Sequence, residues 1–457
     1  MRIPRLVLAG LSGGAGKTIL SLAVARALGD RGLDVRPFKK GPDYIDAAWL
    51  GRAAHRPCTN LDPHLLPEHV LSALFAERAA GGDVAVIEGN RGLFDGMDVH
   101  GTSSTARLAR MLAAPVVLVI DATKMTRTVA AIVQGCAGFD PGIRLAGVIL
   151  NRTAGPRHRS QLTQAIEAHT DVPVLGLLPK LDDPIPERHI GLISGHEHDA
   201  GDRALARLGA LAEDWLDLDA LLAAAQAAPE YPDCGPLPWP EPVADEAPSI
   251  GYVEDEALWF YYPENLEALT RAGARLVRLS LLDDAPWPEL HGLYLGGGFP
   301  ETLAERLSAN TERLAEVRAL AESGMPVYAE CGGFMYLGES VTFGERSYPM
   351  SGVLPVSTSL CERPQGLGYV EAESELDNPF HPAGTVFTGH EFHYSLCAET
   401  GEATPPLALS MRRGTGMLHG RDGMVSGGVF ACYVHLHALG APHWAPNFVR
   451  AAAAFRG

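Results

Sequence analysis

The chain opens with an apolar run, a glycine-rich loop and a helical pattern in direct succession. The run "LVLAG" (residues 6–10) is followed by "LSGGAGKT" (11–18) and then by "ILSLAVARALGDRG", which ends at Gly32. Glycines in such a loop turn backbone N–H groups toward phosphate oxygens, the lysine reaches the terminal phosphates, and the hydroxyl ligates Mg²⁺. This order predicts an α/β domain with a nucleotide-binding loop. The predicted nucleotide-binding loop consists of Ser12, Gly13, Gly14, Ala15, Gly16, Lys17 and Thr18.

Two details of the loop bear on the class of protein. The strict P-loop pattern has its first glycine where this chain has Leu11, and Gly10 stands one place earlier. Partition-type switch ATPases carry a signature lysine where this chain has Ser12. The missing lysine favours an enzyme that uses ATP for chemistry, and a nucleotide-switch binding protein is the alternative.

Alternating apolar runs and helical stretches divide the chain into two α/β domains. In the first half, "DVAVIEG", "PVVLVIDA", "LAGVILNR" and "VPVLGLLP" predict strands that are buried on both faces, hence a parallel sheet covered by helices. Residues 226–247 contain six prolines and predict an extended linker. A second series follows with "SIGYVED", "ARLVRLS", "GLYLGGG" and "PVYAECGG". We expect domains at 1–225 and 248–457.

Acidic side chains near the loop supply candidate ligands for magnesium. Asp43 and Asp46 lie in "FKKGPDYIDAAW", and Glu88 ends a predicted strand at the sheet edge where ligands gather. With Thr18 they form the predicted metal site. Asn151 ends a later strand and is a candidate for reading the adenine edge, although an Asn that starts a turn fits equally well. Asp95 follows in a glycine-flanked loop and is a candidate substrate contact.

Charge and cysteine usage restrict the partners and the compartment. The 457 residues carry a formal net charge of −18, which argues against nucleic acid or an anionic membrane as the main partner. A polyanionic substrate therefore requires local positive charge, for which Lys39, Lys40 and Arg91 are candidates. The seven cysteines form no CxxC pair, no run is long enough to span a membrane, and no signal peptide is recognisable. We expect a cytoplasmic protein.

The stretch "PVYAECGGFMYL" (326–337) places Cys331 between small residues directly after a short apolar run. This layout is typical of a nucleophile elbow, a tight strand-to-helix turn that only small neighbours fit. A helix N-terminus and a nearby base lower the pKa of a thiol, and we expect both effects at Cys331.

A thiol nucleophile needs a base and an oxyanion hole. "CYVHLHALG" supplies His435 and His437 at strand spacing. The glycine run 296–298 predicts an oxyanion hole in which the N–H groups of Gly297 and Gly298 join that of Gly332. A zinc site at Cys432 and the two histidines lacks a second Cys/His pair at the usual spacing and is disfavoured.

These motifs together resemble a known family. "ECGGFMYL", "LGGGFPE", "GLGYVEAE", "GHEFHYS" and "YVHLH" are similar to the cobyrinate branch of class I glutamine amidotransferase domains. "GLSGGAGKT", "FKKGPDYID", "TNLD", "IEGNRGLFDG" and "IPERHIGL" resemble the synthetase domain of the cobyrinate a,c-diamide synthases, which is related in fold to dethiobiotin synthetase. Gly296 stands where the family usually has proline. His437 stands where class I enzymes have the glutamate of a Cys-His-Glu triad, so the resemblance implies a Cys331–His435 dyad.

The resemblance implies a reaction and its partners. ATP with Mg²⁺ would phosphorylate a carboxylate of a corrinoid polyacid, and ammonia released from glutamine by Cys331 would convert the acyl phosphate to an amide at the a and c acetate side chains. Lys39, Lys40, Tyr44, Ile45 and Asp95 would contact this substrate. The alternatives are an a,c-diamide synthase that acts on Ni-sirohydrochlorin or hydrogenobyrinic acid, and cobyric acid synthase, which amidates other side chains of the corrinoid. A homodimer is a separate expectation.

Overall fold

The structure is a computed structural model that describes residues 1–181, 195–401 and 405–456, with the backbone alone for residues 195–199. The chain divides into two compact units, Met1–Leu237 and Pro238–Gly457. The division falls inside the stretch 226–247 that the prolines indicate as a linker. The motif "IPERHIGL" (185–192) lies outside the described residues.

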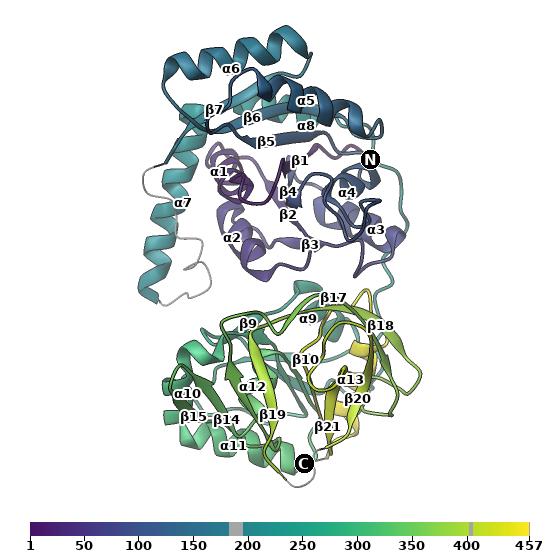
Figure 1. The fold of residues 1–457 in the computed structure, drawn as a ribbon. Helices are drawn as coiled ribbons and strands as arrows, with labels where there is room; N and C mark the ends of the chain where they lie inside the picture. The colour runs from purple at the N-terminus through teal and green to yellow at the C-terminus, as the bar shows by residue number, and fades with distance from the viewer. Residues whose placement is uncertain (182–194, 402–404, 457) are drawn as a thin grey trace. The chain divides into compact units, whose positions relative to one another are not determined.

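The first unit alternates strands and helices along the chain (Figure 1). Its strands are β1 (Arg5–Gly10), β2 (Val35–Lys40), β3 (Thr59–Leu61), β4 (Val84–Gly92), β5 (Val116–Asp121), β6 (Leu145–Thr153) and β7 (Val174–Pro179). Its helices are α1 (Lys17–Asp30), α2 (Tyr44–Ala54), α3 (Glu68–Ala79), α4 (Thr105–Met111), α5 (Thr128–Phe139), α6 (Pro156–His169), α7 (Gly195–Trp215) and α8 (Leu218–Gln226).

The strands of this unit form one parallel sheet in the order β3-β2-β4-β1-β5-β6-β7. The strands expected at β1, β4, β5, β6 and β7 are all present. One face of the sheet, which includes Leu6, Leu8 and Val86, packs against α1, α2, α7 and α8 in a single hydrophobic cluster. Because neighbouring strands run parallel, the ends of β1, β2 and β4 meet at one edge, which brings distant polar residues together.

The proline-rich stretch contributes to both units. Residues 227–248 form no helix or strand. Tyr231 pairs through its backbone with Met1 and packs its ring against Phe75 at 5.1 Å. Further on, the Arg271 guanidinium lies over the Trp239 ring at 4.8 Å. The stretch is therefore anchored by side chains to the unit on each side of the division.

The second unit contains a larger, mixed sheet. Its strands are β8 (Ser249–Val253), β9 (Leu258–Phe260), β10 (Arg275–Leu279), β11 (Gly292–Leu295), β12 (Gly297–Gly298), β13 (Val327–Glu330), β14 (Ser340–Phe343), β15 (Arg346–Pro349), β16 (Val356–Leu360), β17 (Gly366–Ser374), β18 (Val386–His393), β19 (Ser395–Glu399), β20 (Leu407–Arg413), β21 (Arg421–Ser426), β22 (Val429–Cys432) and β23 (His435–Leu436). Its helical segments are α9 (Pro263–Arg271), η1 (Pro300–Leu303), α10 (Ala304–Ala309), α11 (Thr311–Glu322), α12 (Gly332–Leu337) and α13 (Trp444–Ala454).

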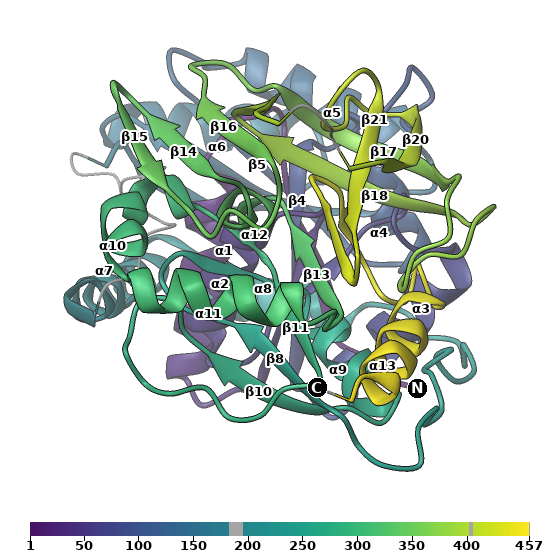
Figure 2. The same ribbon diagram turned by 90° about the horizontal axis from the view of Figure 1, so that it is seen from below.

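The main sheet has the order β10-β8-β11-β13-β22-β21-β20-β17-β18-β23, and its first five strands are parallel. The row β10, β8, β11 and β13 can be followed in Figure 2. Side chains alternate between two cores: Leu293 and Ala329 pack with α11 and α12, whereas Tyr294 and Tyr328 pack with α9 and α13. In the part of the chain that the structure describes, no helix combines the length and apolar character that crossing a membrane requires.

Candidate active sites

The glycine-rich loop leads from β1 into the first turn of α1. Gly14 and Gly16 adopt positive φ angles of 76° and 93°, which favour glycine. A Cβ on Gly16 would come within 2.2 Å of the Asn151 Nδ2 atom. That amide donates to the Ala15 carbonyl at 3.0 Å, while the Asn151 Oδ1 atom accepts from the Arg152 backbone N–H at 2.8 Å. Asn151 thus supports the loop in this structure, and its contact with adenine stays a prediction.

A buried cluster of charges lies beside the loop. The Thr18 hydroxyl donates to the Glu88 Oε1 atom at 2.6 Å, and the Lys39 ammonium donates to the same oxygen at 2.8 Å and also to Asp46. Burial acts to lower the pKa of Lys39, but the carboxylates of Glu88, Asp46 and Asp43 outweigh it and raise that pKa. Burial, reinforced by Asp46, raises the pKa values of Glu88 and Asp43.

The predicted magnesium ligands occupy this cluster together with Lys39. Asp43 caps α2 by accepting from the Asp46 backbone N–H at 2.9 Å. The Glu88 Oε2 atom is buried and has no hydrogen-bond partner among the described residues. No group of three or more His, Cys, Asp or Glu residues in the described segments is arranged as a metal cage. Because Mg²⁺ is usually held by one or two carboxylates together with phosphate oxygens and water, Glu88 and Thr18 fit it.

The other residues predicted to contact the substrate differ in their surroundings. Lys40 is buried, and burial lowers its pKa although Asp62 opposes the shift. Tyr44 is buried and Ile45 half-buried, both in the first turn of α2. The Asp95 carboxylate accepts from the Gly92 backbone N–H at 3.1 Å and closes a turn there. Substrate contact by these residues remains a prediction.

Cys331 lies at a strained turn between β13 and α12. Its φ of 45° is in the left-handed region that non-glycine residues rarely adopt. Its backbone N–H donates to the Cys432 carbonyl at 2.7 Å, which ties the turn to β22. A Cβ on Gly333 would come within 2.4 Å of the Leu295 carbonyl oxygen, so only glycine fits. This geometry matches the elbow that the small residues predict.

The glycines proposed as an oxyanion hole come together beside Cys331. A Cβ on Gly332 would lie 2.9 Å from the Gly298 backbone nitrogen, and the Gly333 N–H donates to the Gly296 carbonyl at 3.0 Å. Gly297 is packed against His435, whose Cε1 atom would be 2.5 Å from an added Cβ. The backbones of Gly298 and Gly332 are thus packed together, while the role of their N–H groups as oxyanion donors remains a prediction.

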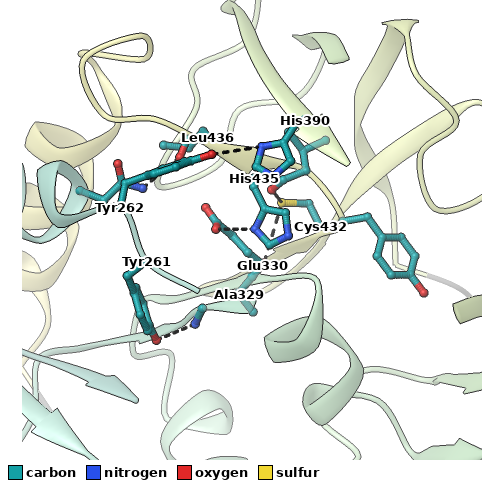
Figure 3. Close-up of polar contacts among 12 residues, drawn as sticks. Tyr261, Tyr262, Ala329, Glu330, His390, Cys432, His435 and Leu436 are labelled. Carbon is teal, nitrogen blue, oxygen red and sulfur yellow. Dashed lines mark hydrogen bonds and ion pairs between the residues drawn. The ribbon is translucent and has the colours of Figure 1, made fainter. Parts of the chain in front are cut away.

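The ring of His435 is held by a glutamate that the motif analysis did not single out. The His435 Nδ1 atom lies 3.1 Å from the Glu330 Oε2 atom, and both side chains are buried (Figure 3). On its other side, His435 stacks on His390 with ring centroids 4.9 Å apart. The sequence feature that could have identified Glu330 is its position: it is an acidic residue at the end of the apolar strand "VYAE", directly before the cysteine.

His437 belongs to a different pair. Its Nε2 atom lies 3.6 Å from the Glu264 Oε2 atom, its Nδ1 atom accepts from the Leu439 backbone N–H at 3.2 Å, and its ring packs on Tyr262. Although His435 and His437 are only two residues apart, each is paired with a different buried glutamate: His435 with Glu330, and His437 with Glu264. Cys432 is the cysteine that the disfavoured zinc site would use as a ligand. Its thiol contacts the carbonyl oxygens of Ala329 and Val434.

The expectation of a lowered thiol pKa at Cys331 is wrong for this structure. Burial, followed by the charge of Glu301, raises the pKa of Cys331. The Gly332 backbone N–H at the start of α12 opposes this shift but is outweighed. The thiol is therefore protonated near neutral pH, and its proton has to be removed by a base as the reaction proceeds.

Comparisons with known proteins agree with both halves of this description. Residues 6–191 match the family described as the CobQ/CobB/MinD/ParA nucleotide binding domain, and residues 249–443 match the CobB/CobQ-like glutamine amidotransferase domain. Three relatives are each named cobyrinate a,c-diamide synthase. The protein of Magnetococcus marinus is 42% identical over 98% of this chain and 97% of its own length. That of Syntrophotalea carbinolica is 42% identical over 98% of both chains. That of Salmonella typhimurium is 38% identical over 98% of this chain and 97% of its own length.

The two family matches define the class of protein: a nucleotide-binding synthetase domain joined to a glutamine amidotransferase domain. The identity to the curated relatives extends over nearly the whole of both chains. The chain belongs to the family of cobyrinate a,c-diamide synthases.

Proposed function

We propose that this protein amidates the a and c acetate carboxylates of cobyrinic acid, a corrinoid precursor in cobalamin biosynthesis, with ATP as the energy source and glutamine as the nitrogen donor. The observation that carries the proposal is the presence of two complementary sites in one chain. One is the glycine loop with the buried Thr18–Glu88–Lys39 cluster, and the other is the Cys331 elbow in the unit that also holds the Glu330–His435 pair. Full-length relatives with this name support the substrate.

In the first unit, the substrate carboxylate oxygen attacks the γ-phosphorus of ATP, ADP leaves, and an acyl phosphate forms. Backbone N–H groups of residues 12–16 and the Lys17 ammonium bind the phosphates and offset their charge. Lys39, buried and paired with Glu88 and Asp46, holds these carboxylates in place, so the positive charge offered to the phosphates comes from Lys17. The chain's own charge of −18 makes such local cations necessary for a polyanionic substrate.

Magnesium fits the carboxylates of this unit. Thr18 and Glu88 would hold the ion, with Asp43 or Asp46 close by, since the buried Glu88 Oε2 atom is otherwise unpaired in the described segments. When bound, the ion would neutralise charge on the β- and γ-phosphates. The other contributions of the cluster do not depend on it: Lys39 orients Glu88, and Asp43 fixes the first turn of α2.

In the second unit, the Cys331 sulfur attacks the glutamine side-chain carbonyl while His435 takes the thiol proton. The proton passes to the leaving nitrogen, ammonia departs, and a thioester remains that water hydrolyses to glutamate. The backbone N–H groups of Gly297, Gly298 and Gly332 stabilise the oxyanion. Ammonia then attacks the acyl phosphate carbonyl carbon, phosphate leaves, and the amide forms.

The test is to incubate the protein with ATP, Mg²⁺, glutamine and one tetrapyrrole at a time, and to follow product mass. The set contains cobyrinic acid, hydrogenobyrinic acid, Ni-sirohydrochlorin and the a,c-diamide that cobyric acid synthase would use. We expect two successive amidations of cobyrinic acid. Amidation of the a,c-diamide alone would overturn the substrate assignment. Homodimer formation and a cytoplasmic location are separate predictions. Light scattering tests the first, and cell fractionation tests the second.

A further inference from the structure

The side chain of His435 is buried, and two titratable side chains, from two different strands, contact its ring. The Glu330 carboxylate from β13 meets the Nδ1 side of the ring at 3.1 Å, and His390 from β18 stacks on its face. Burial, followed by the proximity of His435, lowers the pKa of His390 well below its ordinary value, so His390 is neutral. Glu330 is thus the acidic group that the structure places against the imidazole.

Glu330 is the last residue of β13, directly before the turn that holds the nucleophile. It pairs across the sheet with Cys432 of β22, three residues before His435, and the next residue, Cys331, donates its N–H to the Cys432 carbonyl. The ladder between β13 and β22 thus ties Glu330 and Cys331 to the strand that leads into the His435 segment. The geometry does not rest on a loop, because β13 and β22 lie in the middle of the main sheet.

The groups in contact with Glu330 favour its ionised form, although burial outweighs them and the pKa of Glu330 is raised overall. Burial raises its pKa, while the His435 ring, the Leu436 backbone amide and the Tyr294 hydroxyl all oppose that shift. When His435 takes the thiol proton, an imidazolium forms beside a buried carboxylate with little water to screen the pair. An Nδ1 atom held by a carboxylate leaves Nε2 as the unprotonated nitrogen that can accept the proton.

We propose that Glu330, the residue directly before the nucleophile, is the positioning residue of the glutaminase site. It takes the place of the glutamate that class I enzymes carry two residues after the histidine. It holds His435 in the Nδ1–H tautomer and stabilises the imidazolium. This inference rests on the proposed glutaminase activity and is independent of which tetrapyrrole the first unit amidates.

The chain supplies a matched control in the second buried Glu–His pair. Glu264 and His437 lie in the same unit, are equally buried and are 3.6 Å apart at their closest ion-pair atoms. Glu264→Gln replaces a buried carboxyl group beside a histidine as Glu330→Gln does, but not at the base. The two variants separate loss of a positioning charge from general disturbance of the core.

The experiment measures glutamate release from glutamine, ammonia-dependent amidation, and iodoacetamide alkylation of the Cys331 peptide between pH 6 and 9. In Glu330→Gln, the neutral amide can donate to Nδ1 and reverse the tautomer. We expect the glutaminase kcat to fall by about 100-fold or more, while the KM for glutamine changes little. Both glutaminase activity and the rate of Cys331 alkylation should recover as the pH rises. Ammonia-dependent amidation should stay normal. Glu264→Gln should keep the normal pH profile.

Two results would overturn the proposal: a folded Glu330→Gln variant with normal kcat and an unshifted profile, or an equal shift in Glu264→Gln. If Glu330→Gln does not fold, the ¹⁵N resonances of His435 in the unaltered protein identify the tautomer of its ring. The Nδ1–H tautomer would support the proposal, and the Nε2–H tautomer would contradict it. Alkylation and glutamate release need no tetrapyrrole. A wrong corrinoid assignment would therefore appear only in the amidation assay.

Discussion

At the scale of single residues, Glu301 is the acidic side chain with the clearest bearing on the reactivity of Cys331. It lies in η1, directly after the glycine run, and burial raises its pKa to about 7. Its charge is the second-largest influence raising the pKa of Cys331. Below pH 7 Glu301 is mostly protonated and neutral, and above pH 7 its negative charge opposes formation of the thiolate.

Glu301→Gln should therefore speed alkylation of Cys331 above pH 7 and leave the rate unchanged below pH 6. The gain should reach up to about tenfold, the effect of one pKa unit. Mass spectrometry of the Cys331 peptide measures the rate separately from the other cysteines. Glu305→Gln removes the same charge from an exposed position in α10 and is the control. Equal rates for Glu301→Gln and the unaltered protein at pH 8 would refute this role.

At the scale of elements, the turn from β1 into α1 depends on Gly16. Its φ is 93°, and a Cβ added there would lie 2.2 Å from the Asn151 Nδ2 atom, so a side chain would displace the amide that supports the loop. A left-handed backbone costs about 1–2 kcal/mol for a non-glycine residue, and the clash adds to this. Gly16→Ala should weaken ATP binding by about tenfold or more, as measured by calorimetry.

Gly13→Ala is the control for this loop. Gly13 has no positive φ, and an added Cβ would meet nothing within 4 Å. The alanine also keeps the backbone N–H that faces phosphate. ATP affinity should stay within a few-fold of the unaltered protein, and an equal loss in both variants would show that the loop conformation is not the cause.

The first turn of α2 is the element we expect to decide which carboxylate reacts. Tyr44 and Ile45 lie between Asp43, which caps the helix, and Asp46, which binds Lys39. Because Tyr44 is buried and Ile45 half-buried, the conservative changes Tyr44→Phe and Ile45→Val limit the packing loss. They should alter the proportion or order of a and c amidation more than ATP affinity. Chromatographic separation of the monoamides checks this, and an unaltered product ratio in both variants would count against it.

At the scale of the whole molecule, the two units are expected to divide the reaction between them. Cys331→Ala should abolish glutamine hydrolysis and glutamine-dependent amidation, and it should keep ATP-dependent amidation at high ammonium concentration. Lys17→Ala should abolish amidation with either donor, because the acyl phosphate no longer forms. Assays of each variant with both donors test this. Loss of ammonia-dependent activity in a folded Cys331→Ala variant would contradict the division.

Much of the architecture follows from local patterns. Five strands of the first sheet contain a short continuous apolar run, and such runs indicate strands buried on both faces. The strand β2 was missed because "VRPFKK" contains a proline and two lysines, which read as a polar segment. Lys39 is nevertheless buried, since Glu88 and Asp46 neutralise it. The antiparallel strands β17 and β18 were recognised only as motifs, because their alternation of buried and exposed residues is short and contains glycine.

The sequence by itself determined the order of elements, the glycine loop and the cysteine elbow. Each depends on neighbours in the chain: glycines permit a positive φ, and small residues flank a tight turn. Only the tertiary structure decided which charged groups meet. Glu330 holds His435 across 105 positions, Glu88 binds Thr18 across 70, and burial keeps the Cys331 thiol protonated. Such pairings depend on strand order and on the exclusion of water, which no local pattern of residues encodes.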